Sequence, residues 1–193
     1  WYRGFGTEQS PGVKIFSLSG CVKKPGNYEL PLGVTYQELI FEHGGGIVND
    51  NQIKAVMSAG ASSDVVVADE FCMLTPLAYE TCMERIKAPL GSASVIVLDE
   101  TVDMAWLVSK TVNFFKHESC GKCTPCREGT FWMNRLSEHM MANESSKEDI
   151  DLLRNVAVQM QGKCLCALGE FSTMAVVTAV DRFRTDFEKH VRS

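Results

Sequence analysis

Three cysteines at two-residue spacing place the strictest limit on how this chain can fold. They are Cys120, Cys123 and Cys126, in the segment ESCGKCTPCREGT. A fourth cysteine, Cys166, follows after 39 intervening residues and begins the sequence CALG. If one short loop and one distant cysteine share a metal group, the fold must bring the two segments together.

This cysteine pattern favours a cubane iron–sulfur cluster, which is held by four thiolates. The chain has eight cysteines in 193 residues, and the tight grouping of three of them is unlike the framework of a small secreted disulfide protein. In a reducing compartment such a grouping points to metal binding instead. We therefore predict that the three loop cysteines are ligands.

A structural zinc site is the alternative. Four-cysteine zinc sites usually consist of two separated C-x2-C pairs. Here no second pair at that spacing follows the loop, because Cys164 and Cys166 have only one residue between them. The residues alone leave Cys164 and Cys166 in competition for the fourth ligand position.

The residues around the loop suit a negatively charged group. Thr124 can cap a helix, with Pro125 at its first position and Cys126 in its first turn, at the positive end of the helix dipole. Lys122 and Arg127 add positive charge beside it, although both could equally be ordinary solvated side chains.

Residues 1–99 predict a small α+β domain, since they are rich in glycine and β-branched residues. A capping box of Thr35 and Glu38 predicts a short helix that ends near Gly44. Five apolar segments predict strands, at Val13–Leu18, Tyr28–Leu30, Ile53–Met57, Val65–Val67 and Val95–Leu98. Cys21, Cys72 and Cys82 are scattered here and are expected to be small apolar filler.

Residues 100–193 predict four amphipathic helices joined by short links, and hence an antiparallel four-helix bundle. The first is capped by Thr101 and runs to about His117, and the second runs from Pro125 to about Met141 with Trp132, Leu136 and Met140 on one face. The third is capped by Ser145 and Glu148 and ends at Gly162, with Ile150, Leu153, Val156, Ala157 and Met160 as its apolar face. The last has an apolar face of Phe171, Met174, Val177, Val180, Phe183, Phe187 and Val191. In such a bundle the cysteine loop and Cys166 lie at the same end.

Several segments together resemble one family, the NADH- and FMN-binding subunit of respiratory complex I, which also occurs in NAD-linked hydrogenases and formate dehydrogenases. The resemblance rests on ESCGKCTPCREGT and CALG, on GTEQSPGVKIFSLSG at residues 6–20, and on KPG and LPLG at 24–26 and 30–33. It covers nearly the whole chain. It implies a [4Fe–4S] cluster on Cys120, Cys123, Cys126 and Cys166 that takes electrons from the flavin, with no catalytic residue in this chain.

The resemblance also implies the domain organisation. Residues 1–99 would be a β-grasp domain of the soluble-ligand-binding type with an N-terminal connector, and 100–193 the cluster-binding bundle. Two roles remain possible for the β-grasp domain: it binds a small molecule, or it serves packing and interface contacts. The chain lacks the glycine-rich pattern Gly-x-Gly-x-x-Gly and opens at Trp1 without an initiator Met. We therefore expect the second half of the subunit, excised or separately encoded, with FMN and NAD(H) bound by the absent N-terminal half.

The expected function is to relay single electrons from FMN to the next iron–sulfur carrier. The family implies three partners: the FMN- and NADH-binding half, a thioredoxin-like [2Fe–2S] subunit and a large iron–sulfur subunit. The net charge of −5 argues against nucleic acid, and no apolar run is long enough for membrane insertion. The expected location is the cytoplasm or the mitochondrial matrix side, peripheral to a membrane complex if the parent is complex I.

Overall fold

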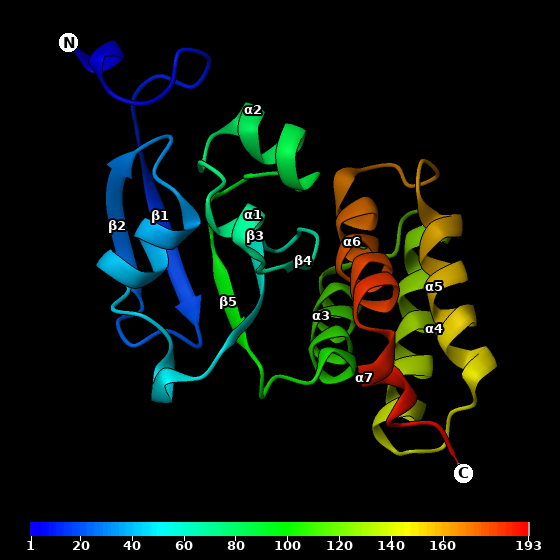
Figure 1. Ribbon diagram of the computed structural model, residues 1–193. Coiled ribbons are helices and arrows are strands. Elements are labelled where there is room, and N and C mark those ends of the chain that lie inside the picture. The colour runs from blue at the N-terminus through cyan, green and yellow to red at the C-terminus, as the bar shows by residue number, and fades with distance from the viewer. Residues whose placement is uncertain (193) are drawn as a thin grey trace. The chain divides into compact units, whose positions relative to one another are not determined.

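The computed structural model describes residues 1–192 and shows a mixed α+β protein (Figure 1). The chain divides into two compact units, Trp1–Thr101 and a second that begins at Val102. The first unit contains all the strands, and the second is helical.

The first unit is built on a five-stranded sheet with the strand order β2-β1-β5-β3-β4. The strands are β1 (Val13–Gly20), β2 (Gly26–Pro31), β3 (Ile53–Ala61), β4 (Val66–Val67) and β5 (Ile96–Asp99). β1 pairs with β2 antiparallel and with β5 parallel, and β3 is antiparallel to both β4 and β5. The five strand predictions are therefore confirmed, with β1, β2 and β3 longer than expected.

The core of this unit forms where short helices cover the sheet. Phe16 and Leu18 of β1 are buried in one cluster with residues of the segment before Gly44, a π-helix at Glu38–His43. The predicted capping box is present: Thr35 N donates to Glu38 Oε2 at 2.8 Å, and Glu38 N donates to Thr35 Oγ1 at 3.1 Å. Short helical segments lie at Tyr2–Gly4, Val48–Asp50, α1 (Glu70–Met73), α2 (Tyr79–Thr81) and Cys82–Ile86. Cys72 and Cys82 are buried in the same core and Cys21 packs against it, as expected of apolar filler.

The second unit contains α3 (Met104–Glu118), α4 (Thr124–Met141), α5 (Lys147–Met160), α6 (Ala167–Arg182) and α7 (Arg184–Glu188). Among the four long helices, α3 and α5 each pack against both α4 and α6, and α4 also contacts α6. Of the face predicted for α5, Ile150, Leu153, Ala157 and Met160 are buried. No helix within residues 1–192 is both long and apolar enough to cross a membrane.

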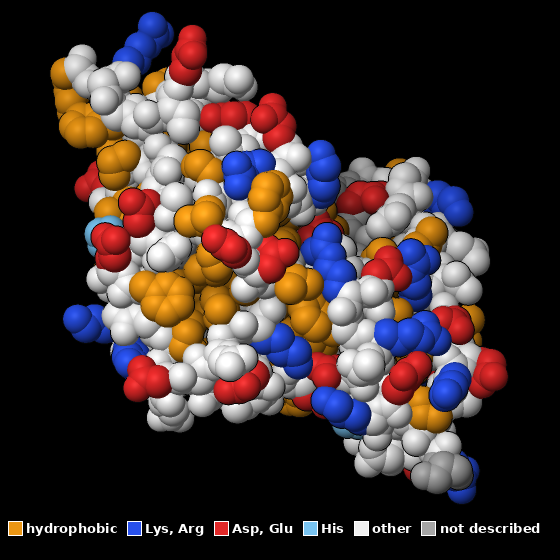
Figure 2. Space-filling model, in the orientation of Figure 1, with side chains coloured by type: hydrophobic (Ala, Val, Ile, Leu, Met, Phe, Trp, Pro, Cys, Tyr) orange, Lys and Arg blue, Asp and Glu red, His pale blue; other side chains and the backbone are white. Residues whose placement is uncertain are grey.

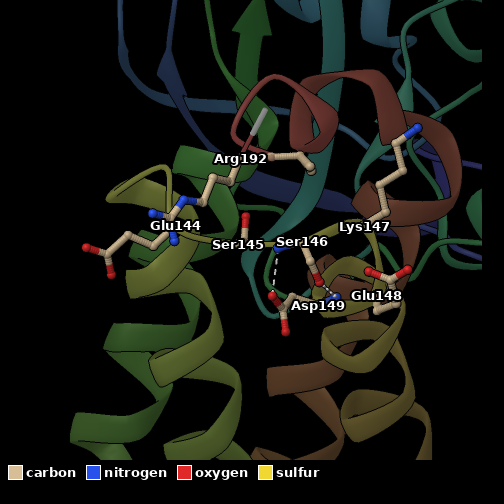
Figure 3. A pocket seen from close by; sticks show the side chains of 8 residues that line it. Glu144, Ser145, Ser146, Lys147, Glu148, Asp149 and Arg192 are labelled. Carbon is tan, nitrogen blue, oxygen red and sulfur yellow. Dashed lines mark hydrogen bonds between the residues drawn. The ribbon is translucent and has the colours of Figure 1, made fainter.

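The predicted caps of α3 and α5 are wrong by one or two residues. Asp103, not Thr101, caps α3, and its carboxylate accepts from the N–H groups of Ala105 and Trp106. The capping box of α5 is Ser146 with Asp149, not Ser145 with Glu148. Figure 3 shows both of its hydrogen bonds, from Ser146 N to the Asp149 carboxylate and from Asp149 N to Ser146 Oγ.

The predicted apolar faces of two helices also differ from the structure. Trp132 is 56% exposed, and Met133 takes its place in the core beside Met140. The single last helix is in fact two, because α6 ends at Arg182 and α7 begins after Phe183. The face that α6 buries consists mainly of small residues, namely Gly169, Ser172, Thr173, Ala175, Val176, Ala179 and Val180.

Replacing Asp186 by alanine should destabilise the helical unit. This carboxylate is 4% exposed; it accepts from Met104 N at 3.1 Å and from Lys189 Nζ at 2.7 Å, so it joins α7 to the start of α3. Loss of the acceptor leaves a buried N–H unpaired, which costs about 1–3 kcal/mol. In urea unfolding, the free energy of unfolding should fall by this amount for Asp186→Ala and by less for Asp186→Asn. It should change little for Glu188→Ala in the same helix. Equal stability of Asp186→Ala and wild type would exclude this role.

Candidate metal centre

The four cysteines that the sequence singles out line a single cavity. This cavity has a volume of about 200 Å³ and is lined by Glu118, Ser119, Cys120, Lys122, Cys123, Cys126, Leu165, Cys166 and Leu168. Its walls come from the segment between α3 and α4, the first turn of α4, and the segment that leads into α6. The fold thus brings the loop and the distant cysteine together.

Two long helices begin at this cavity. Cys123 is the N-cap residue of α4 and Cys166 is the N-cap residue of α6, while Cys126 lies in the first turn of α4 and is only 6% exposed. Thr124 is therefore the first helical residue rather than the predicted cap. Helix N-termini carry unsatisfied N–H groups and a partial positive charge, so both favour a negatively charged group in the cavity.

Hydrogen bonds fix the shape of the cysteine loop. Gly121 has a φ of 72°, the left-handed region that favours glycine, and its N–H donates to Ser119 Oγ at 3.3 Å. Ser119 Oγ in turn lies 3.2 Å from Cys126 Sγ. Arg127 donates from Nη1 to the Gly121 carbonyl at 2.9 Å and pairs with Glu128 at 2.8 Å. The role of Ser119 could not be read from the sequence, because its contact depends on the folded loop.

The thiols of the cavity influence one another electrostatically. Backbone N–H groups, first that of Leu165 and then that of Cys126, lower the pKa of Cys123. Burial raises the pKa of Cys126, and the neighbouring sulfurs of Cys123, Cys166 and Cys120 raise it further. Ionising several of these thiols together is therefore unfavourable without a compensating positive charge, which bound metal ions would supply.

The donor groups that line the cavity are chiefly thiols. Four thiolates are the donor set of both iron–sulfur clusters and structural zinc sites. Within the described part of the chain, however, no three His, Cys, Asp or Glu side chains converge closely enough to hold one ion.

Cys164 lies outside the set of cavity-lining residues. Its Sγ lies 3.6 Å from the Met160 carbonyl oxygen and packs against Gly169, where an added Cβ would lie 2.3 Å from that sulfur. Burial raises the pKa of Cys164 to about 11, and the neighbouring Cys123 and Cys126 sulfurs contribute.

Two histidines of the helical unit, His117 and His190, are not among the residues that line the cavity. His117 is exposed in the last turn of α3, which suits a histidine at the negative end of a helix. His190, for which the sequence gives no partner, contacts Asp103 at 2.8 Å and Asn143 at 3.0 Å, and so supports the start of α3.

Two further hollows occur in the helical unit. One of about 520 Å³ lies at the start of α5, around the Ser146–Asp149 capping box and Arg192 (Figure 3). The other, of about 370 Å³, lies between α4 and α5 and includes Pro125, Leu152 and Val156. Neither of these two hollows is lined by a cysteine.

Replacing Arg127 by glutamine should lower the midpoint potential of a bound cluster without loss of iron. The guanidinium is half exposed and paired with Glu128, so its field at the cavity is screened. We expect a shift smaller than about 59 mV, the equivalent of a tenfold change for one electron. Arg135→Gln is the matched control, since Arg135 lies in the same helix, is 53% exposed and pairs with Glu138. Equal potentials for the two variants in a redox titration would show that the Arg127 charge has no effect.

Comparisons with known proteins agree with this geometry. Residues 106–190 match the family "NADH-ubiquinone oxidoreductase-F iron-sulfur binding region", and residues 15–62 match the SLBB domain. The chain is 38% identical to an NADH-quinone oxidoreductase F subunit of Rhizobium meliloti, the one numbered 2, over 99% of this chain and 45% of the relative. It is 40% identical to the corresponding F subunit of Mycobacterium tuberculosis, over 99% of this chain and 42% of the relative. The chain thus spans less than half the length of these relatives.

A solved structure shows the same fold. The crystal structure of NAD⁺-reducing [NiFe]-hydrogenase in the H2-reduced state matches all of this chain and 32% of the hydrogenase chain, with a TM-score of 0.87 and 30% sequence identity. The chain therefore carries an SLBB domain and the iron–sulfur binding region of the NADH-ubiquinone oxidoreductase F family, and its homologues are NADH-quinone oxidoreductase F subunits.

Proposed function

We propose that this chain is the electron-transfer module of an NADH-oxidising flavoprotein subunit. It would relay single electrons from FMN, bound by another part of the subunit, to the next iron–sulfur carrier. The observation that carries the proposal is the cavity at which α4 and α6 both begin and which Cys120, Cys123, Cys126 and Cys166 line together. The match of residues 106–190 to an iron–sulfur binding region supports it.

In this proposal the four cysteines are the ligands of a [4Fe–4S] cluster. When bound, such a cluster supplies one-electron redox chemistry at a potential set by charge and hydrogen bonds. The chain's own residues hold and shield the site. The backbone of Leu165 lowers the pKa of Cys123, Ser119 lies beside Cys126, and Lys122 places a positive charge at the cavity wall.

We also propose the finer architecture that the family resemblance implies. Residues 1–99 form a β-grasp domain with an N-terminal connector, supported by the strand order β2-β1-β5-β3-β4 and the SLBB match. Residues 100–193 form an antiparallel four-helix bundle, supported by the mutual packing of α3, α4, α5 and α6.

The proposed partners are the FMN- and NADH-binding half of the subunit, a thioredoxin-like [2Fe–2S] subunit and a large iron–sulfur subunit. The family relatives named as oxidoreductase and hydrogenase subunits support partners of this kind. On the face shown in Figure 2, basic and acidic side chains are interspersed, unlike the basic stripe of a nucleic-acid-binding surface. The proposed location is the cytoplasm or the mitochondrial matrix side, without direct membrane insertion.

Two alternatives differ in ways that can be measured. A structural four-cysteine zinc module would use the same cysteines for docking rather than electron transfer. A subunit of an NAD-dependent hydrogenase or formate dehydrogenase would use the same cluster within a different assembly, and the hydrogenase match suits this reading as well as it suits complex I.

Anaerobic reconstitution of the chain with iron and sulfide tests the proposal against zinc. We expect a brown protein with broad visible absorption that bleaches on reduction, and a paramagnetic signal that appears with one electron per chain. A colourless protein that binds one zinc per chain and no iron would overturn the electron-transfer function in favour of docking.

A further inference from the structure

Ser119 joins the end of α3 to the cysteine loop. It is the C-cap residue of α3, and its backbone N–H donates to the Phe115 carbonyl at 2.9 Å. Its side-chain oxygen accepts a hydrogen bond from Gly121 N at 3.3 Å. These two bonds hold the hydroxyl group at the wall of the cysteine cavity, of which Ser119 is a lining residue.

In this position the hydroxyl group meets the sulfur of a proposed ligand. Ser119 Oγ lies 3.2 Å from Cys126 Sγ, which is a hydrogen-bonding contact. Cys126 is held as firmly as Ser119, because it is buried in the first turn of α4 and its carbonyl accepts from Thr130 Oγ1 at 2.8 Å. The contact therefore joins two groups that the ends of α3 and α4 keep in place.

Metal binding would decide which atom of this pair is the donor. Without metal, either the hydroxyl group or the thiol can supply the hydrogen. A cysteine that binds a metal has lost its proton, so Cys126 can then only accept. The Ser119 oxygen already accepts from Gly121 N, and its own O–H is the group left to donate. A hydrogen bond to a charged sulfur is stronger than one between neutral groups.

We propose that the Ser119 hydroxyl donates a hydrogen bond to the Cys126 sulfur of the loaded site and thereby raises the reduction potential of the cluster. The inference rests on the proposed function, and it adds a residue that tunes the cluster without binding iron. Reduction adds negative charge to the cluster and its sulfurs. A donor to a ligand sulfur therefore stabilises the reduced form more than the oxidised form.

The effect of Ser119 should differ from that of a nearby charge in its dependence on salt. The hydroxyl group is neutral and acts by direct contact with one sulfur. The Arg127 charge is half exposed and acts through solvent, so added salt screens it. A change in potential that stays the same at low and high ionic strength is thus the mark of the hydrogen bond.

Three variants of the reconstituted chain test this role. Ser119→Ala removes the donor, and Ser119→Thr keeps a hydroxyl group on the same carbon atom. Ser109→Ala is the matched control, since Ser109 lies in α3 and is partly exposed like Ser119 but does not line the cavity. Iron and acid-labile sulfide are measured first. Midpoint potentials are then compared by redox titration at low and high salt, and resonance Raman spectra are recorded in H2O and D2O.

We expect the wild type and all three variants to hold four irons. At a fixed applied potential, the ratio of reduced to oxidised cluster should fall about threefold to tenfold in Ser119→Ala at both salt concentrations, tenfold being about 59 mV for one electron. Ser119→Thr should keep most of the wild-type ratio, and Ser109→Ala should leave it unchanged. The deuterium shift of the iron–thiolate stretching modes should shrink in Ser119→Ala and persist in Ser119→Thr.

Other outcomes overturn the inference in distinguishable ways. A wild-type potential and deuterium shift in an iron-replete Ser119→Ala would show that the hydroxyl donates no bond to the cluster. An equal fall in Ser119→Ala and Ser119→Thr would assign the effect to packing. If Ser119→Ala loses its iron, a deuterium shift absent from both the wild type and Ser119→Thr would equally exclude the bond. A wild-type chain that holds no cluster would contradict the proposed function itself, and with it the inference.

Discussion

Replacing Cys120, Cys123 or Cys126 by serine is expected to remove or convert the cluster and to lower the stability of the helical unit. All three thiols line one cavity, and a group that binds only the folded state stabilises that state. At a thousand times its dissociation constant the stabilisation is about 4 kcal/mol, so thermal unfolding followed by circular dichroism should detect the loss.

Cys21→Ser is the control for this experiment, because its thiol lies in the first unit and away from the cysteine loop in sequence. It should retain full iron and sulfide. The ligand assignment fails if the triple variant of Cys120, Cys123 and Cys126 still binds four irons with matching acid-labile sulfide.

The second large effect separates Cys166 from Cys164. Cys166→Ala should leave a three-iron form or an apoprotein, since Cys166 lines the cavity at the start of α6. Cys164→Ala should keep a complete cluster, because Cys164 does not line the cavity and its sulfur packs against Gly169 instead. Electron paramagnetic resonance distinguishes an oxidised three-iron signal from a reducible four-iron one. The reverse assignment of these two signals would move the fourth ligand to Cys164.

The elements that the sequence predicted well are those with strong local signals. β1 alternates buried Phe16 and Leu18 with outward-facing Ile15 and Ser17, so its period of two is clear. The convergence of the cysteine loop with Cys166 followed from the order and number of the helices. These features depend on spacing along the chain, which the sequence contains in full.

The caps were mispredicted where two neighbouring residues offer the same signal. Ser145 and Ser146 are each followed three residues later by an acidic residue. Tertiary structure decides between them, because Ser145 Oγ donates to the His190 carbonyl and is not available as a cap. Likewise the Thr101 hydroxyl donates to Asp99, which leaves Asp103 to cap α3.

The apolar faces of α4 and α6 were mispredicted because size was taken as a sign of burial. α6 approaches its neighbours closely through Gly169, Ala175 and Ala179, while Phe171 is 38% exposed. Exposed aromatic residues are common on folded surfaces, and their burial depends on what packs over them. The contact of Ser119 with the Cys126 sulfur was unpredictable for the same reason, since it exists only once the loop is folded.

Mössbauer spectroscopy of the chain reconstituted with iron-57, before and after reduction, tests the proposed metal centre most directly. If Cys120, Cys123, Cys126 and Cys166 hold one four-iron, one-electron cluster, the spectra should show four irons per chain in a [4Fe–4S] cluster with delocalised valence. Reduction should then add one electron. Isolated ferrous or ferric ions, a two-iron cluster, or a chain that binds only zinc would contradict this assignment.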